Sequence, residues 1–469
     1  MTGGREPGHG GVTMRTSRAL PSVAVLALAA LLPLSSACGD ESGSPRFGAR
    51  STGTSSPDEP PFIGPPPAPP PLAHVEKKEL IATDEELLAA GADGTRPEAP
   101  WSFRHLVEML AAPGDPQAFV RSWLGTWQRT ATDASEGSLP LDVRAAVRSE
   151  LACRWLHATP ANACDATCGT CASEIYDLAK APFRLLAIVN RLDLSETTSG
   201  CAPDAAEGRF VFVAVRDGVV QPFNLIFEYG VDGTKAGDPS AWHALGGLSG
   251  LEYRAALEAL TRSFTDAGRS DLAPSRLKQL RTGENLGVAR GTSFELRQFV
   301  SRDGMLAPTA LTNTAVDFMN GTTTLTKHVK EHFSQIFAGD NAITSAQRTA
   351  VSTLPSADFR WVDDQSETNR EMDLFGLSTC NGCHGGHRGD TMNLPFSHIG
   401  VNSMGQTVLS RFLQDPSSGG ADELSFRGRS LARRIAGECG DTPEATYGGR
   451  RGGGGIPKRE GDARVMRTH

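Results

Sequence analysis

The spacing of hydrophobic residues predicts helices in three stretches of the middle of the chain. Apolar positions recur at intervals of three and four residues over 102–128 and 141–157, and again near 251–264. A helix with that spacing carries one apolar face, which has to be buried against another element. These stretches are therefore expected to pack on a common core.

Four other stretches are rich in β-branched and aromatic residues and are predicted to be strands. They are 183–194, 208–218, 222–231 and 293–300. A short turn containing Asp217 and Gly218 joins the middle two, and this favours a hairpin. Strands that follow one another without an intervening helix usually pair antiparallel. The predicted fold class is α+β, an antiparallel sheet with flanking helices, followed by a small, mainly α-helical domain.

The N-terminus has the pattern of an export signal. Arg15 and Arg18 precede an apolar run over 23–34, which is long enough for a signal core but too short to span a bilayer. Small residues then lead into Cys38, and this resembles a bacterial lipoprotein signal, although Leu34 stands four residues before the cysteine where such signals usually have three. The resemblance implies that Cys38 is lipidated and anchors the protein in the cell envelope, in the periplasm or at the cell surface. Secretion without a lipid is the alternative, and Met14 is a possible start.

Composition separates the two ends of the chain from its folded part. Residues 38–80 are polar and then proline-rich, which predicts a flexible and partly stiff stalk, and the Gly/Arg-rich residues 441–469 predict a disordered tail. The expected organisation is a signal peptide (1–37), the stalk (38–80), an α+β domain (81–345), a small helical domain (346–440) and the tail (441–469). The formal net charge of −8 gives no reason to expect nucleic acid as a partner.

The chain has nine cysteines, and an exported protein meets an oxidising compartment. Cys38 is set aside for the lipid, and two more belong to the motif described next. The remaining six, an even number, are candidates for disulfides: Cys153, Cys164, Cys168, Cys171, Cys201 and Cys439. The close spacing within CDATCGTC also suits a metal site. Connectivity does not follow from the sequence.

The most specific motif is CNGCH, formed by Cys380, Cys383 and His384. Two thiols one helical turn apart can add to the two vinyl groups of haem, and the following imidazole can ligate the iron. The stretch MDLFGLSTCNGCHGG resembles the haem-attachment segment of small c-type cytochromes, over about residues 365–440. The resemblance implies a covalently attached haem c that serves one-electron transfer, with an unidentified redox partner protein, or small-molecule sensing.

The second axial ligand of such a haem is expected from the residues that follow the motif. His398 lies in an apolar setting within LPFSHIG, and it is preferred over Met404 in the more polar NSMGQ. Met392 and His387 are weaker candidates. The alternatives for CNGCH itself are a tight disulfide between its cysteines, or another metal held by His384 and His387.

Two further functions remain open from the sequence. The first is a non-haem surface binding lipoprotein with disulfide-clipped domains. The second, weaker, is a zinc hydrolase. His328, Glu331 and His332 form H-x-x-E-H, which resembles the helix signature of the inverted zinc peptidases. No third ligand stands out, so a solvated helix with Phe333 and Ile336 buried is the preferred interpretation. No catalytic residue is assigned.

Overall fold

The structure is a computed structural model, and it describes the chain between residues 72 and 438 with gaps. The described ranges are 72–129, 131–132, 140–141, 143–197, 200–201, 205–266, 276–287, 294–302, 304–311, 317–337, 342–344, 352–353, 359–367, 369–383, 397–410, 413 and 423–438. The predicted signal peptide, Cys38, most of the stalk and the tail lie outside these residues.

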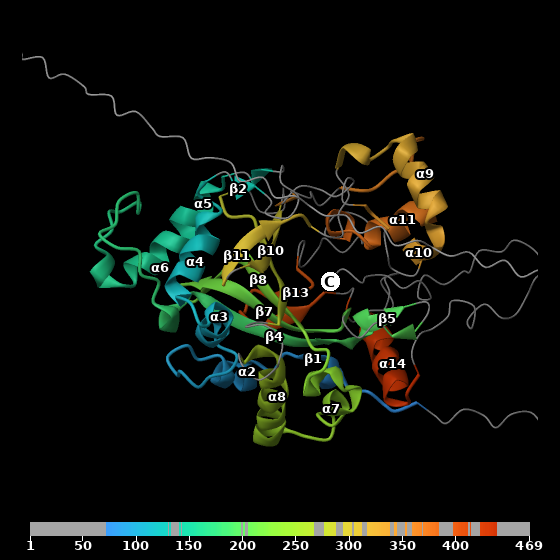
Figure 1. The fold of residues 1–469 in the computed structure, drawn as a ribbon, viewed down its shortest axis with the longest axis horizontal. Coiled ribbons are helices and arrows are strands. Elements are labelled where there is room, and N and C mark those ends of the chain that lie inside the picture. The colour runs from blue at the N-terminus through green and yellow to red at the C-terminus, as the bar shows by residue number, and fades with distance from the viewer. Residues whose placement is uncertain are drawn as a thin grey trace, which may run out of the picture. The chain divides into compact units, whose positions relative to one another are not determined.

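An antiparallel sheet forms the centre of the described fold (Figure 1). Its strands, in spatial order, are β1 (Ile81–Ala82), β4 (Phe183–Arg191), β7 (Glu207–Arg216), β8 (Val219–Gly230), β9 (Leu277–Glu284), β10 (Glu295–Arg302) and β11 (Met305–Thr309), and β12 (Ser352–Thr353) also pairs with β10. Every pairing along this order is antiparallel. The antiparallel sheet with flanking helices is thus confirmed.

The predicted hairpin joins β7 to β8. Arg216 pairs with Val219, and Asp217 and Gly218 form the turn with φ of 51° and 77°. Positive φ at both central residues is the geometry whose twist matches that of the flanking strands. Strand β9 was not predicted, because its sequence LKQLRTGE alternates apolar residues with charged ones too weakly to stand out.

The helices that precede strand β4 in the chain are interrupted more often than predicted. They are α1 (Lys77–Leu80), α2 (Glu85–Gly91), α3 (Phe103–Ala111), α4 (Pro116–Gly125), α5 (Ala145–Val147), the π-helical η1 (Arg148–Ala152) and α6 (Cys153–His157). The single helix expected over 102–128 is two helices. Asp115 caps α4 by accepting from the backbone N–H groups of Gln117 and Ala118, so the chain restarts a helix there.

The remaining elements follow in chain order. The helices are α7 (Pro239–His243), α8 (Gly250–Thr265), α9 (Thr323–Glu331), α10 (Phe333–Phe337), α11 (Arg370–Leu377), α12 (Cys380–Cys383) and α14 (Glu423–Ile435). Short 3-10 helices are η2 (Pro160–Asn162), η3 (Leu178–Lys180), η4 (Leu192–Ser195), η6 (Lys235–Gly237) and η7 (Asp317–Met319). Two-stranded pairs are β2 (Ala131–Thr132) with β3 (Pro140–Leu141), β5 (Glu196–Thr197) with β6 (Gly200–Cys201), and β13 (Ile399–Val401) with β14 (Thr407–Leu409).

One face of the sheet is aromatic and supplies the main core. Successive residues of a strand point to opposite faces, so Phe210 and Phe212 of β7 share a face with Phe227 of β8. Helix α3 contributes Phe103, whose ring lies 6.1 Å from that of Phe227. Helix α8 packs on β8, and its buried residues belong to the same hydrophobic core (Figure 1). This face of the sheet is therefore its apolar face.

The opposite face of the sheet is polar and nevertheless buried. Arg209 of β7 and Glu228 of β8 alternate with the core phenylalanines, and only 5% and 0% of their surfaces are exposed. Segments from the C-terminal third of the chain cover this region: β13 packs on β4, and α14 packs on α1 and η4. The described residues of the predicted small domain thus contribute to the same hydrophobic core as the sheet.

Candidate functional site

The two cysteines of CNGC lie at the ends of one helical turn. Helix α11 leads into α12, and the Asn369 side chain caps α11 by accepting from Met372 N–H. Between the two helices, the Thr379 hydroxyl accepts from Trp361 Nε1 at 2.9 Å and from Gly382 N–H at 3.2 Å. The Thr379 hydroxyl therefore ties the start of this turn to the buried Trp361. Cys380 is 2% exposed.

Gly382 is the residue that allows this turn to pack closely. A Cβ at this position would lie 2.4 Å from the carbonyl oxygen of Gly376 and 2.7 Å from Thr379 Oγ1. Both distances are far below a normal contact, and the Gly376 oxygen belongs to the backbone, which cannot turn away. The glycine between the two cysteines is thus required by the contact between α11 and α12.

Cys380 lies in the wall of a cavity above the polar face of the sheet. The cavity has a volume of about 110 Å³ and is partly open to solvent. Cys380 packs there with three apolar side chains, Phe294, Leu296 and Leu311. The wall of the cavity around the cysteine is therefore apolar.

His398 lines the same cavity, fourteen residues after His384 in the sequence. It immediately precedes β13 of a hairpin, where its backbone carbonyl accepts from Ser410 N–H at 2.8 Å. Its Nδ1 lies 3.2 Å from the Ser410 hydroxyl. A partner on one ring nitrogen fixes the orientation of an imidazole. The structure therefore brings together Cys380 and His398, which the sequence had proposed for one site.

Met404, the alternative ligand, lies elsewhere. It belongs to the turn of the same hairpin, and 75% of its surface is exposed. It lines a second hollow, which adjoins the first at Asn224, Phe294 and Ser397. Its thioether does not line the cavity that contains Cys380.

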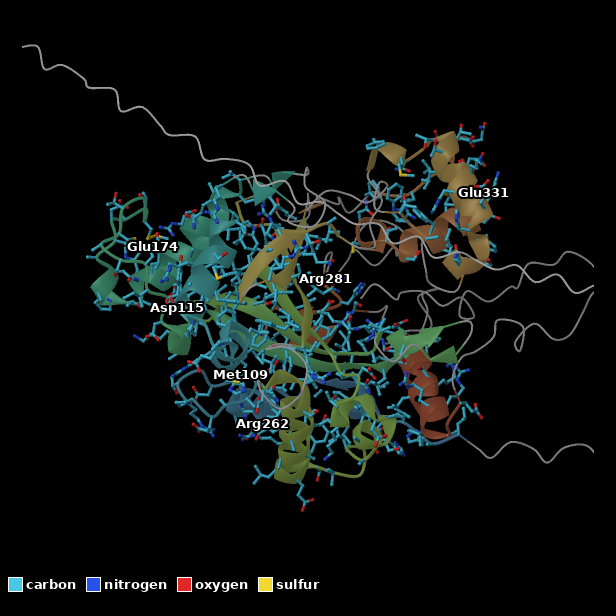
Figure 2. All side chains as sticks on the ribbon, viewed as in Figure 1. Met109, Asp115, Glu174, Arg262, Arg281 and Glu331 are labelled. Atoms are coloured by element: carbon cyan, nitrogen blue, oxygen red, sulfur yellow. A yellow bond between two sulfur atoms is a disulfide. The ribbon has the colours of Figure 1, made fainter. Side chains whose placement is uncertain are left out.

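Charged side chains from the sheet line the floor of the first cavity. Arg209 donates to Glu207 at 2.7 Å and lies 3.6 Å from Glu228. Arg281, which Figure 2 labels, lies at the same 3.6 Å distance from Glu228. Burial alone would raise the pKa of the Glu228 carboxyl, but Arg209 and Arg281 hold that pKa below its ordinary value. Glu228 is therefore a carboxylate held between two guanidinium groups.

Two more ion pairs complete this floor. Arg191 at the end of β4 pairs with Asp193 at 3.0 Å, and Arg427 of α14 pairs with Glu423 at 3.0 Å. Burial raises the pKa of Glu423, although Arg427 acts in the opposite direction. The sequence did not single out these arginines. The available signal was the alternation of charged and apolar residues within strands that are otherwise buried.

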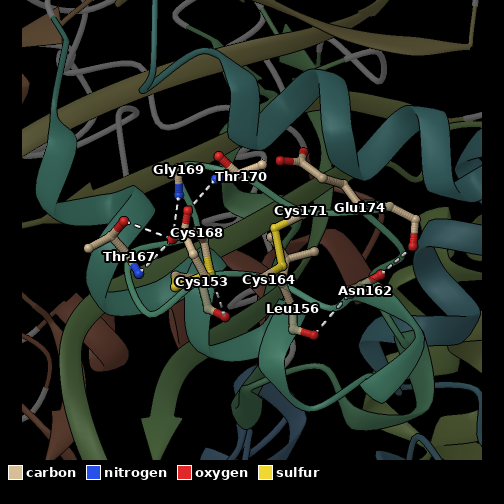
Figure 3. The surroundings of a disulfide bond; sticks show 12 residues. Cys153, Leu156, Asn162, Cys164, Thr167, Cys168, Gly169, Thr170, Cys171 and Glu174 are labelled. Carbon is tan, nitrogen blue, oxygen red and sulfur yellow. Dashed lines mark hydrogen bonds between the residues drawn. A yellow bond between two sulfur atoms is a disulfide. The ribbon is translucent and has the colours of Figure 1, made fainter.

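The cysteines of CDATCGTC are oxidised in pairs (Figure 3). Cys153 bonds to Cys168, and Cys164 bonds to Cys171. The loop is organised by Asp165, whose carboxylate accepts from the backbone N–H groups of Thr167, Gly169 and Thr170 at 2.8–3.1 Å. Sulfur atoms joined in disulfides are not thiolate ligands, so this arrangement favours a structural role over the metal site that the spacing also allowed.

The H-x-x-E-H motif lies on α9 and at its C-terminal end. The His328 and His332 rings are 4.4 Å apart, but His332 Nδ1 lies 2.9 Å from the carbonyl oxygen of His328. Glu331 is exposed and pairs with Lys327 at 3.7 Å (Figure 2). Within the described ranges, no third His, Cys or carboxylate forms a ligand group with the two imidazoles. Ile336 is buried as predicted, and Phe333 is half-buried.

Several predicted site residues lie outside the described part of the chain. These are His384, His387, Met392, Cys439, and the side chains of Cys383 and Cys201. No family model, curated protein or solved structure matches this chain. Among the described residues, no helix has both the length and the apolar character needed to cross a bilayer.

Proposed function

We propose that this chain is an exported, lipid-anchored protein that binds one covalent haem c. The observation that carries the proposal is that Cys380 of CNGCH and His398 line the same cavity. The apolar wall at Phe294, Leu296 and Leu311 fits a porphyrin, which is itself largely apolar. Cys380 and Cys383 would hold the haem as thioethers, and His384 with His398 would ligate the iron. When bound, the haem supplies a one-electron redox couple.

The protein's own side chains would position the haem and exclude water from it. Ser410 orients the His398 ring, and the contact between α11 and α12 at Gly382 places Cys380 in the cavity wall. A ligand pair of two imidazoles favours a lower reduction potential than imidazole with thioether. These features suit one-electron transfer to a redox partner protein. A vacant axial position would suit small-molecule sensing instead.

The test is expression of the full chain in a bacterial host, with and without its machinery for covalent haem attachment. With the machinery, the purified protein should be red and keep its haem through denaturing electrophoresis. Without it, the protein should be colourless. A colourless protein from both hosts would reject the haem proposal and favour the alternative, a non-haem surface binding lipoprotein.

The ligand assignment has its own experiment. His398→Ala should remove the low-spin oxidised spectrum, because it deletes the imidazole at the cavity, whereas Met404→Ala should leave the spectrum unchanged. The opposite pattern would assign the iron to Met404.

The lipid anchor is proposed from the sequence around Cys38. The mature protein should begin at Cys38 and partition with membranes, and Cys38→Ala should release it into the soluble fraction. An unmodified N-terminus beyond residue 38 in soluble material would reject the anchor.

A further inference from the structure

A second hollow lies beside the cavity that Cys380 lines. The first half of β8 forms one side of it, and β13 with the turn that follows forms the other. Two hydrogen bonds hold the β13 segment on the sheet: Asn224 donates to the Ser397 hydroxyl, and Arg184 of β4 donates to the Gly405 carbonyl at 2.8 Å. The hollow has a volume of about 700 Å³, within the range of about 300–1,000 Å³ that is common for small-molecule sites.

None of the described residues that line this hollow is charged. The adjoining cavity differs, because five arginines and a glutamate line it. A charged ligand in the hollow would lose part of its hydration without meeting a side chain of opposite charge, so the lining favours an uncharged ligand. The polar side chains of the lining are carboxamides and hydroxyls: Gln221, Asn224, Asn285, Asn402, Ser397 and Ser403.

Asn285 is a buried member of this lining with an incomplete set of hydrogen bonds. It follows β9, where its backbone N–H donates to the Pro222 carbonyl at 3.1 Å, and only 6% of its surface is exposed. Within the part of the chain that the structure describes, no group donates to its buried Oδ1. A buried acceptor without a donor is costly, and a ligand in the hollow that supplies the donor offsets that cost.

Two neighbouring carboxamides also offer acceptors to a ligand. Gln221 Nε2 donates to the Val219 carbonyl at 2.9 Å, and Asn224 Nδ2 donates to Ser397. These bonds use the amide nitrogens and leave the side-chain oxygens as acceptors. A ligand rich in hydroxyl groups suits them better than a peptide, because a hydroxyl can rotate to donate, whereas a peptide brings a carbonyl acceptor with nearly every N–H.

The hollow also has exposed apolar side chains. Val219 at the start of β8 is 60% exposed, and Met404 in the turn between β13 and β14 is 75% exposed. Val220 and Val401 line the hollow between the polar residues. The C–H face of a sugar ring is apolar and would cover such side chains, while the hydroxyls at the edge of the ring meet the carboxamides.

We propose that this hollow binds a neutral carbohydrate. Its hydroxyl groups donate to the side-chain oxygens of Gln221, Asn224 and Asn285, and its C–H faces pack on Val219 and Met404. This inference goes beyond the haem proposal and does not depend on it.

The first experiment applies the fluorescently labelled full chain, from a host without haem-attachment machinery, to a glycan array. The array carries neutral hexose and N-acetylhexosamine oligosaccharides and also sulfated and sialylated glycans. The chain should bind neutral glycans. Binding to acidic glycans alone, or to no glycan, would overturn the proposal, and this result needs no variant to fold.

The second experiment titrates the neutral glycan that binds most tightly on the array, by calorimetry, into the parent and two variants. Asn285→Leu should weaken binding by about tenfold, because it removes the buried acceptor. Its melting temperature should not fall, since no described residue donates to that oxygen. The matched control is Gln128→Leu, which removes an exposed carboxamide that does not line the hollow and should bind as the parent does. Unchanged affinity in a folded Asn285→Leu protein would overturn the assignment of the site.

Discussion

The chain contains the spacing Cys-x-x-Cys in two regions, and the backbone uses it differently in each. In CGTC, Cys168 has a left-handed φ of 53°, and its sulfur bonds to Cys153 while that of Cys171 bonds to Cys164. In CNGC, the two cysteines begin and end the one-turn helix α12, and Cys380 lines a cavity. Spacing alone therefore does not decide what a pair of cysteines does. The local backbone conformation and the neighbouring elements do.

The environments of the two pairs explain this divergence. The CGTC loop is shaped by one exposed carboxylate, that of Asp165, which collects successive backbone N–H groups. The CNGC helix is shaped by contact with α11 and by the buried Thr379 hydroxyl. A loop held by local hydrogen bonds suits disulfides to nearby cysteines. A helical turn packed beside a cavity suits a ligand.

The largest expected effect separates the two pairs by chemistry. Cys380→Ala with Cys383→Ala should abolish covalent haem, because both thioether positions are removed. Cys164→Ala with Cys171→Ala should retain it, because those sulfurs are already bonded to each other. Haem staining after denaturing electrophoresis measures both. Staining that persists without Cys380 and Cys383 would show that CNGC does not attach the haem.

Loss of the disulfides should lower the free energy of unfolding more than loss of the two CNGC cysteines does. The Cys153–Cys168 bond spans 15 residues, and the loop-entropy relation gives about 3 kcal/mol for removing it. The Cys164–Cys171 bond spans 7, for which the same relation gives roughly 2.5 kcal/mol. Urea unfolding of Cys153→Ala with Cys168→Ala, and of Cys164→Ala with Cys171→Ala, measures these two losses in the free energy of unfolding. Native alkylation should label none of these four cysteines before reduction, and labelling of the parent would contradict the pairing.

Gly382 tests whether packing holds the CNGC turn. Gly382→Ala should destabilise the protein by about 1–3 kcal/mol, since the added Cβ meets the Gly376 carbonyl. Gly125→Ala is the matched control, because a Cβ at this position in α4 meets nothing within 4 Å. Thermal melts of the two variants give the comparison. A Gly382→Ala protein as stable as the control would show that the turn can shift without loss.

The smallest effect concerns Asp165 in the CGTC loop. Hydrogen bonds from the Thr167 side chain and from the backbone N–H groups of Thr167, Gly169 and Thr170 lower the pKa of this exposed carboxyl to about 2. Because the folded pKa lies below the unfolded value of about 3.9, the stabilisation is complete above that value and is lost as the pH falls through 2. The melting temperature of Asp165→Asn should be below that of the parent at pH 5, and the difference should shrink toward pH 2 and vanish below it. A pH-independent difference would show that charge is not involved.

The sequence by itself predicted the local features of this protein. Apolar spacing identified β4, β7, β8, β10 and α8, because each carries its periodicity within one continuous stretch. The hairpin between β7 and β8 followed from the short turn that contains Asp217 and Gly218. The helical turn at CNGC was also expected, since covalent haem attachment would need the two thiols one turn apart.

Only the tertiary structure decided what lies together. The floor of the cavity combines Arg191, Arg209 and Arg281 from three strands with Arg427 from a helix far along the chain. The alternation of charged and apolar residues within one strand does not say which other strands or helices its charged residues meet. The pairing of Cys153 with Cys168 was likewise undetermined, because several connectivities fit the same spacing. His398 came to lie in the cavity of Cys380 through the packing of β13 on β4. Such contacts depend on the register of the sheet and on what covers it, and a linear sequence does not state either.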